Sequence, residues 1–204
     1  MRPHHLKETI DFIARYYDGQ KYGREGVEGY RKPTDLMKFA RVADELRRLG
    51  VVDEDTTVFL DLGRADGRVN VLWSYSVKRS VGIEIDPLIV QEYEPRKAVL
   101  LEALKRENRP LPPDNIHVFL GNSLEPETYE TVFNATGVRF SDVDLFYTYI
   151  TLHDLFGEMI ASRAKKGAHY LVYGFSRVLP RYEGLEVVIP NVASQSIAAL
   201  YRKT

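Results

Sequence analysis

The sequence predicts an α/β protein with a doubly wound, mostly parallel seven-stranded sheet that ends in an antiparallel hairpin. Apolar runs of strand length alternate with helix-length segments from residue 57 to residue 173, which is typical of parallel strands joined by right-handed crossovers. The chain then closes with two apolar runs, 186–189 and 196–201, with no helix-length segment between them. We expect these last two strands to pair antiparallel.

The composition is that of an ordinary globular chain without cysteine chemistry. Its 204 residues, 44% hydrophobic and 28% charged, suit one domain with a sizeable core. A formal net charge of -1 argues against a nucleic-acid reader held by bulk electrostatics, and leaves a local basic patch open. The absence of cysteine excludes disulfides, thiolate metal sites and a cysteine nucleophile together.

The sequence shows no membrane, export or metal-binding signal. No apolar run approaches the ~20 residues that a membrane helix needs, and Met1–His5 lacks the apolar core of a signal peptide. No group of His, Asp and Glu residues has metal-ligand spacing. We therefore expect a cytoplasmic protein with no membrane partner and no metal, and we leave its oligomeric state open.

The first fifty residues predict two helices separated by a loop. Apolar residues recur at helical spacing from Leu6 to Tyr17, and again over about 35–49. Thr34 is expected to be the N-cap of the second helix, with Asp35 favouring its positive end. Between the helices, residues 20–32 (QKYGREGVEGYRK) contain three glycines and mixed charges and are expected to form a mobile lid loop.

The alternating part of the chain predicts five strands and four helices ahead of the hairpin. The strands are expected at about 57–62, 80–85, 116–120, 143–149 and 169–173. Asp86 followed by Pro87 is a clear helix start, and the helices are expected at about 68–76, 87–107, 127–135 and 152–164. Pro95 lies inside the longest helix and should kink or split it.

A turn with the spacing acid-x-Gly-x-small-x-Gly follows the first strand, beginning at Asp61. Gly63 is expected to let the chain bend where a Cβ would clash, Ala65 to let a ligand approach the backbone, and Gly67 to let the helix begin close to the strand. The dinucleotide fingerprint Gly-x-Gly-x-x-Gly would place a glycine at Arg68 and therefore fails. The turn favours another nucleoside-bearing cofactor, although glycines are also routine in any strand-to-helix turn.

Polar residues also end the second and third strands. Glu84 is placed to accept hydrogen bonds from both hydroxyls of a ribose, and the alternative is a surface acid in a strand-end loop. Asp86 is better explained as the cap of the following helix. Asn122 could pair with an adenine edge, and its alternative is a plain turn residue.

These motifs resemble the class I S-adenosylmethionine (SAM)-dependent methyltransferases, and the resemblance extends along most of the chain. Residues 61–68 (DLGRADGR) and 82–87 (GIEIDP) are similar to the branch with an Asp-Leu-Gly-Ser-Gly-Asp-Gly-Arg type turn, which includes seven-strand protein-lysine methyltransferases. Residues 30–34 (YRKPT) resemble the segment that closes over the cofactor in that branch. The terminal hairpin resembles the family's reversed last strand.

The resemblance implies a Rossmann-like fold, SAM as the cofactor, and methyl transfer to an acceptor, with a protein lysine preferred over a small molecule. It implies an N-terminal helical and lid region at 1–50 and a SAM-binding region at 51–204, in one compact domain overall. Asp61 and Gly63 would lie near the methionine end, Glu84 would hold the ribose, and Asn122 with Ser123 would flank the adenine. The expected cofactor set is completed by Tyr30, Thr34, Ala65 and Gly67.

Three departures from the family pattern matter. Arg64 and Ala65 replace a small residue and the middle glycine, and Ala65 should be tolerated if its φ stays negative. Asn122 stands where an acid is common. The fourth strand ends in DLFYTY and lacks the Asn/Asp-Pro-Pro-Tyr/Phe signature of enzymes that methylate adenine or glutamine amino groups, which disfavours those acceptors.

The acceptor is expected beside the tip of the fourth strand, where Tyr147, Tyr149 and His153 are the candidate catalytic residues. Methyl transfer mainly requires that the acceptor be aligned and water excluded. A lysine or phenol acceptor must lose a proton, which His153 or a tyrosine could take. The alternative is that the tyrosines pack in the core and that His153 with Asp154 only begins a helix.

Two rival functions remain open on the sequence. The first is another nucleotide-cofactor enzyme such as a dehydrogenase, against which Arg68 in the turn and the reversed hairpin both argue. The second is a non-catalytic SAM-fold protein that serves in binding or as a scaffold. The altered pair Arg64-Ala65 is the feature that favours it most.

Overall fold

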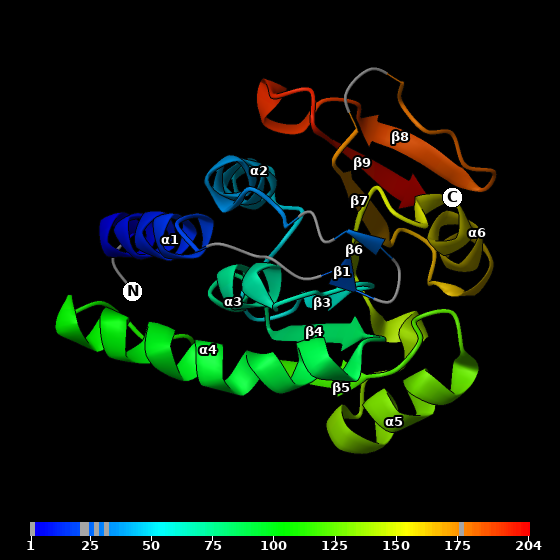
Figure 1. Ribbon diagram of the computed structural model, residues 1–204. Coiled ribbons are helices and arrows are strands. Elements are labelled where there is room, and N and C mark those ends of the chain that lie inside the picture. Colours follow the sequence, from blue (N-terminus) through cyan, green and yellow to red (C-terminus); the bar gives the residue numbers. More distant parts are fainter. Residues whose placement is uncertain (1–2, 21–24, 27–28, 31–32, 176–177) are drawn as a thin grey trace.

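The computed structural model describes residues 3–20, 25–26, 29–30, 33–175 and 178–204, and its centre is a seven-stranded sheet (Figure 1). The strand order is β5-β4-β3-β6-β7-β9-β8, with the first five strands parallel and β9 antiparallel to both its neighbours. The strands are β3 (Val58–Asp61), β4 (Arg79–Glu84), β5 (Ile116–Leu120), β6 (Leu145–Tyr149), β7 (His169–Tyr173), β8 (Leu185–Ile189) and β9 (Ala198–Lys203). The predicted fold class and the terminal hairpin are confirmed.

Six α-helices in the described ranges cover the two faces of the sheet. They are α1 (Pro3–Asp18), α2 (Leu36–Arg48), α3 (Arg68–Ser74), α4 (Pro87–Arg106), α5 (Pro126–Thr136) and α6 (His153–Arg163). Short 3-10 turns, η1 (Phe140–Asp142) and η2 (Val192–Ser194), precede β6 and β9. All the helices expected from periodicity are therefore present, with boundaries that differ from the predicted ones by at most three residues.

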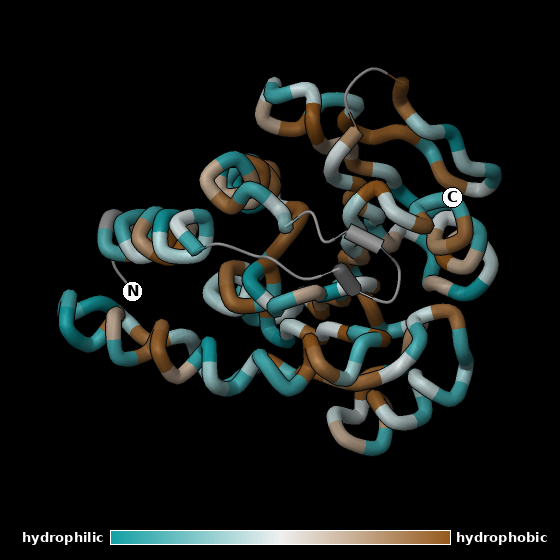
Figure 2. The backbone as a smooth tube through the Cα atoms, viewed as in Figure 1, coloured by the Kyte–Doolittle hydropathy of each residue, from teal (hydrophilic) through white to brown (hydrophobic). Residues whose placement is uncertain are grey.

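Two apolar cores lie on opposite faces of the sheet because strand side chains alternate in direction. Phe59 packs with residues of α1 to α4, whereas Leu60 packs with residues of α5 and α6. The same alternation separates Leu145 and Tyr147 from Phe146. Figure 2 shows the hydrophobic colour concentrated along the inner strands, while the outer helices mix both colours as amphipathic helices do.

The N-terminal helices belong to the first of these cores. Ile13 of α1 and Phe39 of α2 are fully buried in the same cluster as Phe59 of β3. In the 20–32 region the described residues form a two-residue antiparallel ladder, β1 (Glu25–Gly26) with β2 (Gly29–Tyr30). The rest of the predicted lid lies outside the described residues.

Two local expectations are corrected. The N-cap of α2 is Asp35, not Thr34: the Asp35 carboxylate accepts a hydrogen bond from Lys38 N at 2.9 Å. Pro95 does not split α4, which runs unbroken from residue 87 to residue 106. No helix among the described residues is both long and apolar enough to cross a membrane.

Candidate cofactor and acceptor site

The turn after β3 lies at the carboxyl edge of the sheet and is bonded to both neighbouring strands. Leu62 N donates to Tyr147 O of β6, and Arg64 N donates to Ile83 O of β4, each at 3.0 Å. In the sheet register Asp61 lies opposite Tyr147. Backbone hydrogen bonds therefore fix the turn, and they bring the tip of β3 beside the tip of β6.

Asp61 is a buried carboxyl at this edge. Asp61 is 1% exposed, and its Oδ1 accepts a hydrogen bond from Gly63 N at 3.2 Å. Burial raises the pKa of Asp61 to about 8, opposed by the Gly63 amide and the positive charge of Arg64. The carboxyl therefore holds its proton at neutral pH, and a cation placed beside it would draw that proton off.

Glu84 fastens the turn to the tip of β4. Oε2 accepts from Ala65 N at 2.8 Å and Oε1 accepts from Asp86 N at 3.0 Å. A carboxylate oxygen can accept two hydrogen bonds, so each retains capacity for one more donor. The sequence predicted a ligand-binding role or a surface acid for Glu84, and it missed this structural role of a buried carboxylate.

Ala65 contradicts the expectation of a negative φ, because its φ is +48°. A left-handed conformation costs a non-glycine residue about 1–2 kcal/mol. Contacts on both sides of the residue hold it: Glu84 accepts from its amide, and Arg64 Nη1 donates to its carbonyl oxygen at 3.3 Å. The middle position of the turn thus keeps a glycine-like backbone with an alanine side chain.

The predicted need for glycine is wrong at Gly63 and right at Gly67. Gly63 does not have a positive φ, and a Cβ built on it meets no atom within 4 Å. Gly67 has a φ of +75°, and a Cβ there would lie 2.6 Å from Cε2 of the Tyr93 ring. Gly67 is also the N-cap of α3, so the close approach of helix and turn depends on it.

The two glycines provide a matched pair of substitutions. We expect Gly67→Ala to lower the free energy of unfolding by about 2–4 kcal/mol, because it adds left-handed strain and a clash with the buried Tyr93. Gly63→Ala should change it by less than about 1 kcal/mol, because its Cβ has space. Urea unfolding of both variants measures the difference; equal losses would contradict this account of the turn.

Arg64, the other departure from the family pattern, is directed beneath the turn. Arg64 is 1% exposed, and its guanidinium lies 4.8 Å from the Tyr93 ring centroid. A Cβ built on Gly82 would lie 2.8 Å from Arg64 Cδ, so the small residue in β4 makes room for the arginine. Burial lowers the pKa of Arg64, and the negative charge of Glu84 is the largest effect that opposes this shift. Arg64 is accommodated between β4 and α4 as a buried cation beneath the turn.

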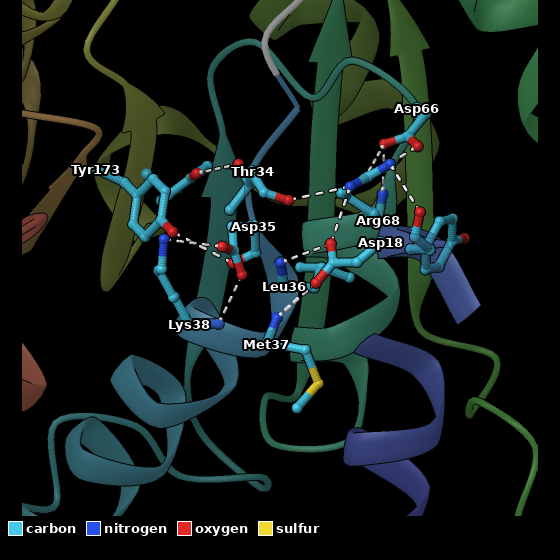
Figure 3. A network of polar contacts seen from close by, with 11 residues as sticks. Asp18, Thr34, Asp35, Leu36, Met37, Lys38, Asp66, Arg68 and Tyr173 are labelled. Carbon is cyan, nitrogen blue, oxygen red and sulfur yellow. Dashed lines mark hydrogen bonds and ion pairs between the residues drawn. The ribbon is translucent and has the colours of Figure 1, made fainter. Parts of the chain in front are cut away.

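Arg68 joins the turn to the N-terminal segment (Figure 3). Its Nε lies 3.1 Å from both carboxylate oxygens of Asp66, and its Nη1 donates to Thr34 O at 3.0 Å and to Asp18 Oδ1 at 3.4 Å. The Asp18 carboxylate in turn accepts from Leu36 N and Met37 N at 2.9 Å each, at the start of α2. In the sequence, Arg68 stood as the failed third glycine and as the last residue of the methyltransferase-like turn, and its ion pair was not predicted. The available signal was an arginine two residues after an aspartate in that turn.

Tyr147 lies in the centre of an aromatic cluster, and its hydroxyl is hydrogen-bonded to Thr34. Its hydroxyl lies 2.7 Å from Thr34 Oγ1, and its ring packs edge-on against Phe39 at 5.2 Å between centroids. Burial, and then the nearby Asp61, raises the pKa of Tyr147 well above its ordinary value. A phenol with so high a pKa stays protonated at neutral pH and cannot take a proton from an acceptor. Its surroundings therefore favour the interpretation that Tyr147 packs in the core.

The other two acceptor candidates have different surroundings. Tyr149 is half-buried, with its ring 5.9 Å from that of Tyr173. His153 is the first residue of α6, as the alternative reading expected, but its Nδ1 lies 2.9 Å from Asp154 Oδ1 and 2.8 Å from Tyr182 Oη. Nδ1 can either donate to the Asp154 carboxylate or accept from the Tyr182 hydroxyl, and in the first of these tautomers Nε2 carries the lone pair that a proton acceptor needs. Of the three candidates, His153 has the arrangement best suited to accept a proton.

The predicted adenine residues behave differently from each other. Asn122 forms a turn, since its Oδ1 accepts from Leu124 N at 3.0 Å and its Nδ2 donates to Glu125 Oε1 at 3.2 Å. Ser123 is buried, yet its hydroxyl has no hydrogen-bond partner within the described part of the chain. A buried polar group of this kind normally has a partner, so Ser123 is the stronger candidate for a ligand contact. The backbone of Tyr30 lies in β2, and its side chain lies outside the described residues.

Comparison with known proteins identifies the fold. No family model and no curated protein matches the sequence. An RNA methyltransferase from Salinibacter ruber, in complex with S-adenosyl-L-homocysteine, matches at 18% identity over 85% of this chain and 94% of that chain, with a TM-score of 0.51. The chain has the α/β methyltransferase fold.

Two further structures agree with the methyltransferase fold. The yhhF protein from Escherichia coli is 19% identical over 89% of this chain and 92% of that chain, with a TM-score of 0.52. A mutant of MtNAS in complex with S-adenosylmethionine is 13% identical over 98% of this chain and 72% of that chain, with a TM-score of 0.50. Identities this low establish the architecture of this chain and leave its substrates to be argued from its own residues.

The methyltransferase fold brings the predicted cofactor groups to one edge of the sheet. Asp61, Glu84 and Ser123 end or follow the adjacent parallel strands β3, β4 and β5. Gly121 N donates to Glu84 O at 2.9 Å, which links the tips of β4 and β5 directly. Ligands of open parallel sheets bind at this carboxyl edge, so these groups form one candidate site.

Proposed function

We propose that the protein binds SAM and transfers its methyl group to an acceptor. The observation that carries the proposal is the set of polar groups at one sheet edge: the buried Asp61 carboxyl, the Glu84 carboxylate and the unpartnered Ser123 hydroxyl. Three polar groups after three consecutive parallel strands suit a ligand with a charged end, a ribose and a base. Bound SAM would supply an electrophilic methyl group on its sulfonium.

Different residues along that edge would contact different parts of the cofactor. Asp61 would face a cationic group of the cofactor, and Glu84 would use its remaining lone pairs for the ribose hydroxyls. Ser123 would gain the hydrogen bond that its buried hydroxyl lacks. Thr34, held by Tyr147 and Arg68, positions the N-terminal segment beside the turn. Tyr30, Gly63, Ala65, Gly67 and Asn122 remain predicted members of the site.

On the acceptor side we propose that His153 Nε2 receives the acceptor's proton. Asp154 would fix the tautomer by accepting from Nδ1. Tyr149, half-buried at the tip of β6, remains a candidate for lining the acceptor. His153→Gln should then lower kcat for a lysine or phenol acceptor more than it changes SAM affinity.

The acceptor class needs its own experiment, because the predicted lysine acceptor rests on a sequence resemblance and one compared structure is described as an RNA methyltransferase. The purified protein should be incubated with methyl-labelled SAM and a cell extract, with parallel samples treated with protease or ribonuclease. Label lost only on protease treatment supports a protein acceptor, and label lost only on ribonuclease treatment supports RNA. No transfer to any fraction, despite SAM binding, would support the non-catalytic alternative.

Glu84→Gln tests the cofactor site itself. We expect SAM affinity to fall by about 1–3 kcal/mol, because the ribose would lose a charged acceptor. The exposed Glu183→Gln is the matched control and should leave affinity unchanged. Titration calorimetry measures both, with circular dichroism as the check on folding. Unchanged SAM affinity in folded Glu84→Gln would remove Glu84 from the site, and no SAM binding by the wild-type protein would overturn the proposed function.

A further inference from the structure

An open surface pocket lies where α5, η1 and α6 meet. It borders the candidate SAM site through Tyr129, whose hydroxyl donates to Ser123 O at 2.5 Å. Its volume is about 670 Å³, within the range of pockets that hold small ligands. Aromatic rings and two arginines line it, among them Tyr129, Phe133, Phe140, Arg139 and Arg163. Neither the methyl transfer proposed above nor the packing of the sheet uses these arginines.

Both guanidinium groups are held by aromatic rings. Arg163 lies 5.2 Å from the centroid of Tyr129 and 4.9 Å from that of Phe140, two rings that themselves pack edge-on at 4.9 Å. Arg139 lies 4.7 Å from the centroid of Phe133. Within the described residues neither guanidinium has a carboxylate within ion-pair distance.

This arrangement suits an anionic ligand. A guanidinium stacked on a ring keeps the N–H donors in its own plane available, and the ring restricts its rotamers before a ligand arrives. Glu130 is the one carboxylate in the cavity wall, so two arginines leave a local excess of one positive charge. Asn134 and Ser141 add neutral donors to the same wall. Phosphate oxygens are the acceptors that a pair of arginine forks fits best.

A stacking surface accompanies these donors. Phe133 is 37% exposed, so part of its ring is accessible from the pocket. An exposed ring next to an arginine is the surface on which proteins stack nucleic-acid bases. We propose that the α5–η1–α6 cavity binds a nucleotide, with its phosphate on Arg139 and Arg163 and its base on Phe133. The nucleotide could be free or part of a single strand, and both offer the same phosphate and base.

The experiment uses the full chain and cytidine monophosphate, a nucleotide without the adenine that SAM carries. Calorimetry should detect its binding, while cytidine without phosphate should bind at least tenfold more weakly. Arg139→Gln and Arg163→Gln should each weaken binding about tenfold, and Arg163→Lys should weaken it by less. Arg106→Gln, which removes one charge from the exposed end of α4, is the matched control and should have no effect.

A short 5′-phosphorylated RNA distinguishes the two sources of the ligand. Tighter binding of the RNA than of the mononucleotide, with the same dependence on Arg139 and Arg163, would indicate a strand. Equal or weaker RNA binding would indicate a free nucleotide. Absence of binding by both below millimolar concentration would overturn the proposal, as would equal weakening by Arg106→Gln. None of these outcomes depends on SAM binding, so the proposed methyl transfer stands or fails separately.

Discussion

Arg68→Met is expected to lower the free energy of unfolding by about 3–5 kcal/mol, the usual cost of removing one partner from a buried ion pair. The side chains of Arg68 and Asp66 are each 3% exposed, so the substitution would leave the Asp66 carboxylate buried without its counter-charge. The Thr34 carbonyl would lose its donor as well. Urea unfolding at pH 7 measures the loss.

A double variant separates this ion-pair effect from simple loss of packing. Adding Asp66→Asn to Arg68→Met removes the unpaired charge, so part of the lost stability should return. Amide hydrogen exchange at Leu36 and Met37 should speed up in Arg68→Met, because both amides bond to Asp18, which Arg68 helps to hold. Additive losses in the double variant, or unchanged exchange at these amides, would contradict the role assigned to Arg68.

Asp61 should make the protein less stable as the pH rises from about 4 to about 8. Its pKa is raised to about 8 in the folded chain from 3.8 in the unfolded one, so between these values the folded state binds more protons. Linkage then requires the free energy of unfolding to fall with rising pH across this window. One pKa unit corresponds to about 1.4 kcal/mol, so a shift from 3.8 to about 8 sets an upper bound of about 6 kcal/mol. This slope is opposite in sign to that of an aspartate in an ordinary ion pair.

Asp61→Asn tests this directly, since asparagine resembles the protonated acid at every pH. The variant and the wild type should have similar stability near pH 4, and the variant should be more stable by about 2–4 kcal/mol at pH 8. The exposed Asp55→Asn is the control and should show no pH-dependent difference. A difference between Asp61→Asn and wild type that stays constant from pH 4 to pH 8 would show that Asp61 is ionised throughout.

The same carboxyl gives the proposed SAM site a pH signature. A cation placed beside Asp61 lowers its pKa, so binding of SAM near pH 7 should release up to about one proton. Calorimetry in buffers with different ionisation enthalpies measures this number. SAM affinity should rise as the pH rises toward 8 in the wild type. Asp61→Asn should lose both the proton release and the pH dependence.

The order of elements could be predicted from the sequence because it depends on local patterns. The strands at 116–120 and 169–173 were predicted to the residue, and the hairpin followed from two apolar runs with too short a connection for a crossover. Asp86 and Pro87 marked the start of α4 in the same way. In each case the deciding interactions join residues a few positions apart, so the sequence holds the information directly.

The turn proposed to bind the cofactor could be located from the sequence, but its conformation could not. Positions 61–67 were predicted correctly as a strand-to-helix turn, yet the left-handed residues are Ala65 and Gly67, not Gly63. Ala65 keeps its φ because Glu84, nineteen positions later, bonds its amide. Asp35, not Thr34, is the N-cap of α2. The Thr34 hydroxyl is instead hydrogen-bonded to Tyr147, 113 positions away in the sequence.

The sequence by itself determined the order of strands and helices along the chain and the polar residues that end the parallel strands, because periodicity and strand-end chemistry are local. Only the tertiary structure decided that Arg68 links the turn to Asp18 and that Tyr147 packs in the core with its hydroxyl bonded to Thr34. It also decided that Arg139 and Arg163, stacked on different aromatic rings, line one pocket. Burial and charge pairing depend on which distant segments come together. A spacing pattern in the sequence does not contain this information. The raised pKa of Asp61 depends on it, because burial is the main cause of the shift.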